Sequence, residues 1–316
     1  MAHRSGAIEV PFSFAGARHR EQSPVADRTE RYAVKNIAYT VNCSILLTEL
    51  PLLDRPRAAR DAGFAAVEFW WPFESPTPTD AEVTAFTGAI QDAGVQLTGL
   101  NFAAGDMPAG DRGILSNPAM TQTFRESVDI AVDIAGMLGT RAFNALYGNR
   151  IPESTPAAQD YVGAENLAYA AQAADRIGAT VLVEPVSGAP HYPLKTAADA
   201  IHVIDRVQGE YGAANVRLLA DLYHLHVNGD DVDAAIRHYC NRIGHVQIAD
   251  APGRGEPGSG ELSLNSYLQL LAALGYTGYV GLEYKATRSD TFDWLPPDQR
   301  GITAESARRH AETRIQ

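Results

Sequence analysis

The sequence predicts a single α/β domain folded as a closed (β/α)8 barrel, and three observations support this prediction. Strand-like runs and helix-length amphipathic stretches alternate along the chain from about residue 36 onward. Eight strand-like runs occur within roughly 260 residues, a size typical of such a barrel. No Gly-x-Gly-x-x-Gly fingerprint follows the first run, so a doubly wound dinucleotide-binding sheet is not favoured.

The predicted strands are short aliphatic or β-branched runs bounded by glycine or polar residues. In chain order they cover residues 36–42, 65–70, 95–101, 140–146, 180–184, 216–221, 243–248 and 279–284. Stretches between them, such as 122–138 and 163–177, carry apolar residues at helical spacing. The triplets AGF, AGV, LGT, IGA and LGY precede five of the strands, and their glycines predict helix C-caps.

The two ends of the chain differ from this pattern. Residues 1–35 mix Arg, Ser, Gly and Pro without a clear period, which predicts a flexible N-terminal extension. An arm that packs on another subunit is the alternative. Residues 36–297 are predicted to form the catalytic barrel domain. The C-terminal tail, residues 298–316, is predicted to contain one helix that packs or is solvated and takes no part in catalysis.

Composition excludes several classes of partner. The formal net charge of −12 argues against nucleic acid and against an anionic membrane surface, because both require a basic face. The two cysteines are far apart, so neither a zinc site nor a disulfide framework is indicated. No apolar run is long enough to span a bilayer, and no secretion signal is apparent, so a cytoplasmic location is expected. The expected partners are a small molecule and, as an alternative, further copies of the chain.

Four successive strands in the second half of the chain end on or beside an oxygen donor. The runs are ATVLVE, VRLLAD, IGHVQ and YVGLE, and their donors are Glu184, Asp221, Gln247 and Glu283. In a parallel barrel the carboxyl ends of the strands share one face, so the four donors should converge. An all-oxygen set favours Mg²⁺ or Mn²⁺ over zinc, which prefers His and Cys. The sequence therefore predicts a divalent metal cofactor.

This predicted metal site implies a class of reaction. A cation that binds a hydroxyl and the adjacent carbonyl stabilises an enediolate, the intermediate in moving a proton between neighbouring carbons. Glu184 and Glu283 lie at opposite ends of the arc of ligands, so they are the predicted acid/base pair. Isomerisation of a ketose and an aldose, or epimerisation, is the expected chemistry.

Each donor also has a simpler interpretation. Helix capping alone could explain Asp221, because Asp is a preferred N-cap residue and a helix follows it. Glu184 stands before Pro185 and could face solvent at a loop entry, while Glu283 could pair with Lys285. Gln247 alone would be unremarkable. The placement of all four on successive strand ends is what favours a metal site.

Other candidates for substrate binding follow from their positions. His224 comes three residues after Asp221 and could hydrogen-bond a ligand or the substrate. His245 precedes Gln247 by two residues, so both side chains should point into the barrel. His245 could support a ligand or equally be a buried histidine of the core. Glu68 lies near the end of the second strand and could reach the pocket or form a structural ion pair. An aromatic cluster after that strand either packs the rim or forms a pocket wall: Trp70, Trp71 and Phe73.

Two long loops should overhang the same face of the barrel. Residues 101–118 follow the third strand and residues 249–262 follow the seventh, and loops of this length are usually functional. Arg112 and Arg254 lie on these loops and are suited to bind a carboxylate or phosphate of the substrate. Lys195 is a weaker candidate that a solvent-exposed position would explain equally well.

Seven segments together resemble one known family. They are VNCSILLTELPLLDR (41–55), AGFAAVEFWWPF (62–73), AGDMPAGDRGI (104–114), LVEPVSG (182–188), LLADLYHLHVNGDD (218–231), GHVQIADAPGRGEPGSGEL (244–262) and GYVGLEYK (278–285). The chain resembles the hydroxypyruvate isomerase family of the xylose-isomerase-like, metal-dependent TIM barrels, over about residues 36–297. By this resemblance the four donors correspond to metal ligands, with Glu184 and Glu283 as the proton donor/acceptor pair.

The resemblance implies interconversion of hydroxypyruvate and 2-hydroxy-3-oxopropanoate (tartronate semialdehyde). Close relatives in the family act on 2-oxo- and 3-oxo-tetronates. This chain departs from the family after Glu184–Pro185, where the family tends to have Asn and a longer loop and this chain has VSGAPHYPL, residues 186–194. An isomerase or epimerase of a related oxo-tetronate or ketose is therefore the alternative.

Two other functions are compatible with this fold group. A metal-dependent phosphodiesterase similar to the AP endonucleases would need more histidine ligands and a basic face, and the sequence offers neither. A binding protein that has lost catalysis would not need an acid/base pair, so the presence of both Glu184 and Glu283 favours an enzyme.

Overall fold

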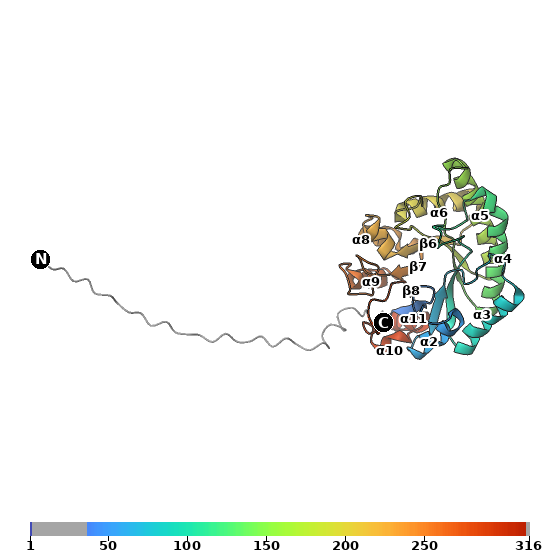
Figure 1. Ribbon diagram of the computed structural model, residues 1–316. Helices are drawn as coiled ribbons and strands as arrows, with labels where there is room; N and C mark the ends of the chain where they lie inside the picture. Colours follow the sequence, from blue (N-terminus) through green and yellow to red (C-terminus); the bar gives the residue numbers. More distant parts are fainter. Residues whose placement is uncertain (2–36, 314–316) are drawn as a thin grey trace.

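The computed structural model, which describes Met1 and residues 37–313, is a closed barrel of eight parallel strands surrounded by helices (Figure 1). The predicted fold class is therefore confirmed. All eight predicted strands are present, with ends that differ from the prediction by at most two residues. They are β1 (Ala38–Asn42), β2 (Ala66–Phe69), β3 (Gln96–Asn101), β4 (Ala142–Asn144), β5 (Thr180–Val183), β6 (Val216–Asp221), β7 (Ile243–Ile248) and β8 (Tyr279–Leu282).

The barrel closes because β1 pairs with β8 as well as with β2. Two registers matter for the site. Asp221 pairs with Gln247, and Gln247 pairs in turn with Gly281. On β1 and β2, which follow β8 around the closed barrel, Asn42 pairs with Glu68. These polar residues therefore lie at similar heights, toward the carboxyl ends of their strands.

The outer layer of the barrel consists of helices. The α-helices are α2 (Arg55–Asp61), α3 (Asp80–Ala93), α4 (Thr121–Leu138), α5 (Pro156–Asp175), α6 (Ala197–Tyr211), α7 (Leu222–Val227), α8 (Val232–Tyr239), α9 (Leu264–Ala273), α10 (Pro297–Arg300) and α11 (Ala304–Thr313). The longer ones, such as α4 and α6, bury apolar residues against the barrel. Short 3₁₀ turns are η1 (Leu52–Asp54), η2 (Pro118–Met120) and η3 (Cys240–Arg242). The glycines of the five predicted C-cap triplets all have positive φ, as expected of that position: Gly63, Gly94, Gly139, Gly178 and Gly275.

Helix α5 begins seven residues before the predicted stretch 163–177 and ends two residues before its end. Its start is fixed by Thr155, whose side chain accepts a hydrogen bond from Ala158 N, and by Pro156 in the first turn. The helix is rich in alanine, so its first turns carry little apolar periodicity. Thr155 and Pro156 were therefore a better sequence signal for the start of this helix than apolar periodicity.

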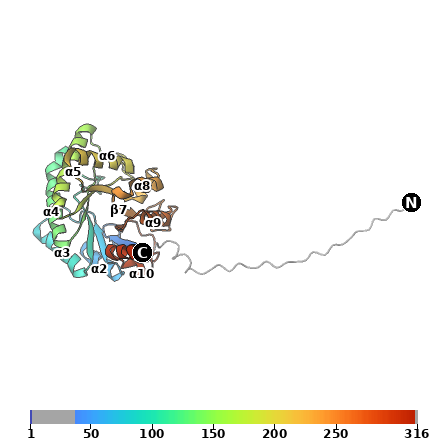
Figure 2. The same cartoon turned by 180° about the vertical axis from the view of Figure 1, so that it is seen from behind.

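The C-terminal tail contains two helices, where the sequence predicted one. The additional helix α10 is a single turn that ends beside Gly301. Arg300 donates hydrogen bonds to the carbonyls of Ala62 and Phe292, which ties the tail to the end of α2 (Figures 1 and 2). The tail therefore packs on the barrel. Packing was one of the two arrangements that the sequence left open, the other being a solvated helix. The predicted extension, residues 1–35, lies outside the described residues apart from Met1.

Candidate active site

Two of the predicted ligands and one histidine meet at the carboxyl ends of β5 and β6. Potential ligand atoms of Glu184, Asp221 and His224 all lie within 4.8 Å of one another, and all three residues are buried. Glu184 follows β5 directly, Asp221 ends β6, and His224 is in the first turn of α7. The spacing of Asp221 and His224 was the sequence signal for this contact.

Asp221 is both a helix cap and a candidate ligand. Its Oδ1 accepts hydrogen bonds from the backbone N–H groups of Tyr223 and His224, so the simpler interpretation is correct for this oxygen. Its Oδ2 is buried and has no hydrogen-bond partner among the described residues. A buried carboxylate oxygen without a hydrogen bond is costly, so Oδ2 is suited to bind a cation.

The tautomer of His224 follows from its contacts with Ser187. The backbone N–H of Ser187 donates to His224 Nδ1 at 3.2 Å, and the Ser187 hydroxyl lies 2.7 Å from the same atom. Nδ1 therefore accepts, and the proton of the neutral ring is on Nε2. That atom faces Asp221 Oδ2 at 3.5 Å and Glu184 Oε1 at 3.9 Å. A protonated Nε2 cannot ligate a metal, so His224 is better suited to donate a hydrogen bond to substrate.

Within the described residues, the amide of Gln247 is hydrogen-bonded on its nitrogen side alone. Its Nε2 donates to Glu68 Oε1 at 2.8 Å, while its Oε1 is buried and has no hydrogen-bond partner in the described part of the chain. Glu68 also accepts from Asn42 Nδ2 at 3.2 Å and lies 2.7 Å from His245 Nε2. Glu68 and His245 thus lie beside Gln247 inside the barrel and line a small interior void rather than the large cavity described below.

Glu283 is held by a different set of contacts. Its Oε1 lies 2.5 Å from Arg254 Nη2, and its Oε2 accepts from Asn42 Nδ2 at 3.0 Å. The same Arg254 atom lies 3.6 Å from Asp221 Oδ2, so the guanidinium bridges two of the predicted ligands. The pairing of Glu283 with Lys285, one of the sequence-based alternatives, is replaced by this contact with Arg254.

Burial and charge shift the ionisation of the central groups. Burial raises the pKa of Glu184, and the charges of Glu283 and Asp221 raise it further. Burial also raises the pKa of Glu283 to about 8, although Arg254 opposes this shift. Burial lowers the pKa of His224 to about 4, so the ring is neutral near pH 7. Two carboxyl groups with raised pKa values in one site are typical of proton-transfer catalysts.

A cavity of about 600 Å³ opens above these residues. Glu184, Glu283 and His224 lie at its base, while Arg112, Arg254 and Lys285 bring positive charge to its walls. The structure therefore places both predicted loop arginines at the cavity and adds Lys285, which the sequence did not single out as a binding residue. Met107 and Pro108 from loop 101–118, and Val186, Ser187 and Gly188 from loop 186–194, complete much of the lining.

The aromatic cluster after β2 divides between the two predicted roles. Trp70 lines the cavity. Trp71 and Phe73 contact each other edge to face at 5.2 Å, and Phe73 contacts Phe86 of α3 at 5.7 Å, so these two rings pack the loop. Lys195 donates to the carbonyl of Ala189 and does not line the cavity.

The loop at residues 249–262 is fixed by its own hydrogen bonds. Asp250 accepts from the backbone N–H groups of Ala251, Gly258 and Leu262. Arg254 adopts a left-handed backbone conformation with φ of 61°, which is unusual for a residue other than glycine. The backbone carbonyl of Arg254 accepts a hydrogen bond from the backbone N–H of Lys285 at 2.7 Å. The loop thus holds the Arg254 guanidinium over the site, where its side chain is only 16% exposed.

Sequence reasoning missed three polar residues that contact the central groups. Asn42 contacts Glu283 and Glu68, Asn144 Nδ2 donates to Glu184 Oε2 at 2.7 Å, and Ser187 fixes His224. Asn42 ends β1 and Asn144 ends β4, so the rule that selected the carboxylates would also have selected these amides. No sequence signal marked Ser187.

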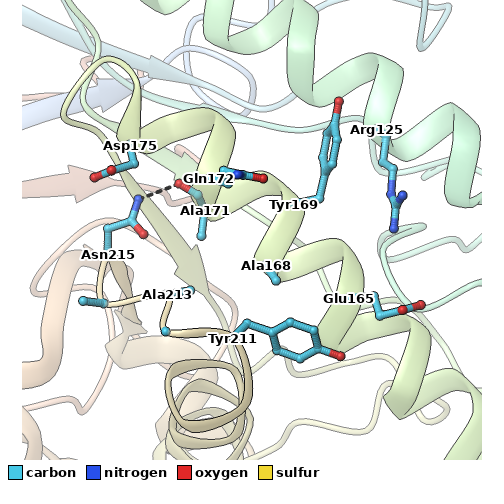
Figure 3. Close-up of a pocket in the computed structure, with 12 residues that line it drawn as sticks. Arg125, Glu165, Ala168, Tyr169, Ala171, Gln172, Asp175, Tyr211, Ala213 and Asn215 are labelled. Carbon is cyan, nitrogen blue, oxygen red and sulfur yellow. Dashed lines mark hydrogen bonds between the residues drawn. The ribbon is translucent and has the colours of Figure 1, made fainter.

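Another cavity, of about 740 Å³, lies on the outside of the barrel between α5 and the loop that leads from α6 to β6 (Figure 3). It is lined by Arg125, Tyr169, Tyr211 and Asn215 among others, and none of the predicted site residues lines it. Asn215 directly precedes β6, so this cavity is at the end of the barrel opposite the carboxyl ends of the strands.

Comparison with known proteins identifies the family. Residues 56–312 match the family described as xylose isomerase-like TIM barrel. The chain belongs to this family. The match extends to residue 312, beyond residue 297 where the predicted barrel domain ends, so it includes most of the C-terminal tail. Among the described residues, no helix is long and apolar enough to cross a membrane.

Several curated relatives are similar over nearly their whole length. A Streptomyces coelicolor protein named "Putative hydroxypyruvate isomerase" is 54% identical over 269 residues, which are 83% of this chain and 96% of that protein. Hydroxypyruvate isomerase of Escherichia coli is 31% identical, with 83% and 99% covered. 2-Oxo-tetronate isomerase of Cupriavidus necator is 35% identical, with 82% and 97% covered. These relatives confirm the predicted resemblance to hydroxypyruvate isomerases and the expectation of an isomerase enzyme.

Solved structures agree on the architecture. A crystal structure from Brucella melitensis described as AP endonuclease, family 2, has a TM-score of 0.73 and 31% identity, with 82% of this chain and 97% of that chain covered. Escherichia coli 3-keto-D-glucoside 4-epimerase has a TM-score of 0.64 and 20% identity, with 88% and 100% covered. At that identity the second likeness supports the fold alone.

Proposed function

We propose that this enzyme is a metal-dependent isomerase that interconverts hydroxypyruvate and 2-hydroxy-3-oxopropanoate. One observation carries the proposal most directly. Asp221 Oδ2 and Gln247 Oε1 are buried oxygens without hydrogen-bond partners in the described structure, in a chain whose relatives include hydroxypyruvate isomerases. Oxygen atoms of this kind match the preferences of Mg²⁺ or Mn²⁺.

Glu184, Asp221, Gln247 and Glu283 would hold the cation. Glu184 and Asp221 already lie together, and Arg254 connects Asp221 with Glu283. When bound, a divalent cation supplies electrophilic stabilisation of the negative charge that develops on the substrate oxygens. His224 takes a different role, because its Nε2 carries the proton and can donate a hydrogen bond to a substrate oxygen.

Glu184 and Glu283 are proposed to move the proton. Burial raises the pKa values of both carboxyl groups, so each holds a proton more readily than an exposed glutamate does. One carboxylate removes the proton from the carbon that bears the hydroxyl, and a proton is then delivered to the former carbonyl carbon, while the hydroxyl proton passes to the former carbonyl oxygen. Both residues lie at the base of the same cavity, which allows a small substrate to lie between them.

The charge of the cavity walls supports an anionic substrate. The whole chain carries a net charge of −12, which repels an oxo-acid at long range. Arg112, Arg254 and Lys285 supply local positive charge beside the acid/base pair. A guanidinium at this position is suited to a carboxylate.

A four-carbon substrate is the second candidate, and the size of the cavity favours it. A volume of about 600 Å³ leaves room beyond a three-carbon acid, and a 2-oxo-tetronate isomerase is among the relatives. A phosphodiesterase is disfavoured by the negative charge of the chain and by the protonated Nε2 of His224.

Proton NMR in D₂O tests the proposal. The purified enzyme with Mg²⁺ or Mn²⁺ is incubated with three- to six-carbon oxo-acids and ketoses, and both turnover and exchange at the carbon next to the carbonyl are followed. Hydroxypyruvate should be converted with incorporation of deuterium. If an uncharged ketose is converted faster than every oxo-acid, the enzyme is a sugar isomerase or epimerase instead.

A further inference from the structure

Glu68 lies inside the barrel and accepts hydrogen bonds from residues on two other strands. Its Oε1 accepts from Asn42 Nδ2 on β1 and from Gln247 Nε2 on β7, and its Oε2 lies 2.7 Å from His245 Nε2. The residue is 3% exposed. None of these contacts involves Glu184 or Asp221, so Glu68 reaches the site directly through Gln247 and, by way of Asn42, through Glu283.

The chemistry of these groups fixes the orientation of the Gln247 amide. A carboxylate can only accept hydrogen bonds, so the group that Gln247 presents to Glu68 must be its NH₂. The amide oxygen is then directed away from Glu68, and it is the buried Oε1 that lacks a partner in the described residues. In the reversed orientation an amide oxygen would face the carboxylate, and two N–H groups would face the proposed cation.

The neighbouring strand leaves room for this contact. Gly281 on β8 pairs with Gln247, and a Cβ atom at this position would lie 2.6 Å from Glu68 Oε1 and 2.8 Å from Gln247 Cγ. Such distances are well inside van der Waals contact. The absence of a side chain at Gly281 therefore allows Glu68 to reach across the barrel to Gln247.

We propose that Glu68 is a positioning residue that holds the amide of Gln247 with its oxygen toward the metal site. This inference rests on the proposed role of Gln247 as a ligand. Glu68 is not a substrate contact in this arrangement, because it lines the interior void beneath the large cavity. Gln247 can present either an oxygen or an NH₂ group, and Glu68 selects the oxygen.

A double-mutant cycle with Mn²⁺ alone as the probe tests the inference. The metal affinity of Glu68→Gln is measured in the natural Gln247 background and in a Gln247→Glu background, by calorimetry and by the electron paramagnetic resonance signal of free aqueous Mn²⁺. In the Gln247 background, Glu68→Gln should weaken binding about tenfold or more, the range seen when a residue that orients a ligand is lost. A carboxylate at position 247 presents oxygen either way, so the loss should disappear there.

A role through charge alone gives a different result. If Glu68 only attracts the cation, Glu68→Gln weakens binding equally in both backgrounds, and the inference is wrong. Glu68→Asp separates the two roles again, because it keeps the charge but withdraws the acceptor. Positioning predicts weaker binding for this variant, and unchanged affinity contradicts it. Thermal melting of each variant reports whether the fold is retained, and Glu68→Asp serves if Glu68→Gln does not fold.

Asp221→Ala distinguishes failure of this inference from failure of the proposed function. If Asp221→Ala abolishes Mn²⁺ binding while Glu68→Gln leaves it intact, the metal site stands and the positioning role falls. If Asp221→Ala has no effect on Mn²⁺ binding, the proposed metal site is itself wrong, and the role of Glu68 falls with it.

Discussion

The two halves of the barrel contribute different kinds of groups to the site. Strands β5 to β8 end on Glu184, Asp221, Gln247 and Glu283, and two of these residues keep buried oxygens without partners in the described structure. Strands β1 to β4 contribute Asn42, Glu68 and Asn144, which hydrogen-bond those residues. In the proposed mechanism the second half therefore supplies the groups for chemistry, and the first half orients them.

Removing the metal should have the largest effect, because the proposed ligands all come from the second half. EDTA should abolish activity, and Mg²⁺ or Mn²⁺ should restore it, as measured by conversion of hydroxypyruvate. Asp221→Ala should prevent the restoration because it removes the unpartnered Oδ2. Full activity in a preparation shown by elemental analysis to be free of metal would contradict this prediction.

The acid/base pair should show the next largest effect. Glu184→Gln and Glu283→Gln keep an oxygen but cannot accept the substrate proton, so turnover should fall by a factor of about 10²–10⁴. Metal affinity, measured by calorimetry, should be retained to a much greater extent. Asn144→Leu is the matched change in the first half: it removes the donor to Glu184 but leaves both carboxyl groups, so its loss of turnover should be clearly smaller. Equal losses would mean that the two halves do not have separate roles.

The cavity arginines should affect substrate affinity more than turnover, and they differ from each other. Arg112 donates to the carbonyls of Met107 and Asp111 in its own loop and lines the cavity, whereas Arg254 also contacts Glu283. Loss of one charge-assisted contact costs about 1.5–3 kcal/mol, so Arg112→Ala should raise KM for hydroxypyruvate tenfold or more. Arg254→Ala should raise KM and lower kcat together, because it also changes Glu283.

Steady-state kinetics with a neutral ketose of equal length provide the control for these arginine variants. The effect of Arg112→Ala should then be small, since no carboxylate is bound. An equal rise in KM for the neutral and the anionic substrate would show that Arg112 supports the loop and does not recognise charge.

The smallest expected effect is a dependence of stability on pH in the EDTA-treated protein. The pKa of Glu283 is raised to about 8 by burial, so its contribution to folding is complete below its unfolded value of 4.5 and is lost as pH rises through 8. The pKa of His224 is lowered to about 4, and its opposite contribution is complete above its unfolded value of 6.5. The melting temperature should therefore fall by a few degrees between about pH 6.5 and 8.5.

Glu283→Gln should reduce the slope of this profile, because one of the two carboxyl groups with raised pKa values is gone and Glu184 remains. Added Mg²⁺ should reverse the trend, because cation binding favours the ionised carboxylates and strengthens as they lose their protons. A melting temperature that rises from pH 6.5 to 8.5 in EDTA would contradict the raised pKa of Glu283.

The same division explains how much the sequence could predict. Strands were predictable because eight aliphatic runs alternate with helix-length stretches and glycine caps precede five of them. Donors such as Glu184 stood out as polar residues that end apolar runs. The orientation of the side chains at the site was not predictable. The contact of Arg254 with Glu283, and that of Ser187 with His224, depend on the paths of loops 249–262 and 186–194. Such paths are determined by side chain–backbone hydrogen bonds that leave no periodic signal.

The hydrogen bonds of Asp250 have a consequence for the energetics of substrate recognition. By accepting from three backbone N–H groups, Asp250 fixes the loop that carries Arg254 in the folded protein itself. The conformational entropy of that loop is lost when the chain folds, so a ligand that contacts Arg254 does not have to order it. Association at this face of the barrel should then approach rigid docking, with the guanidinium already in place when an anion arrives.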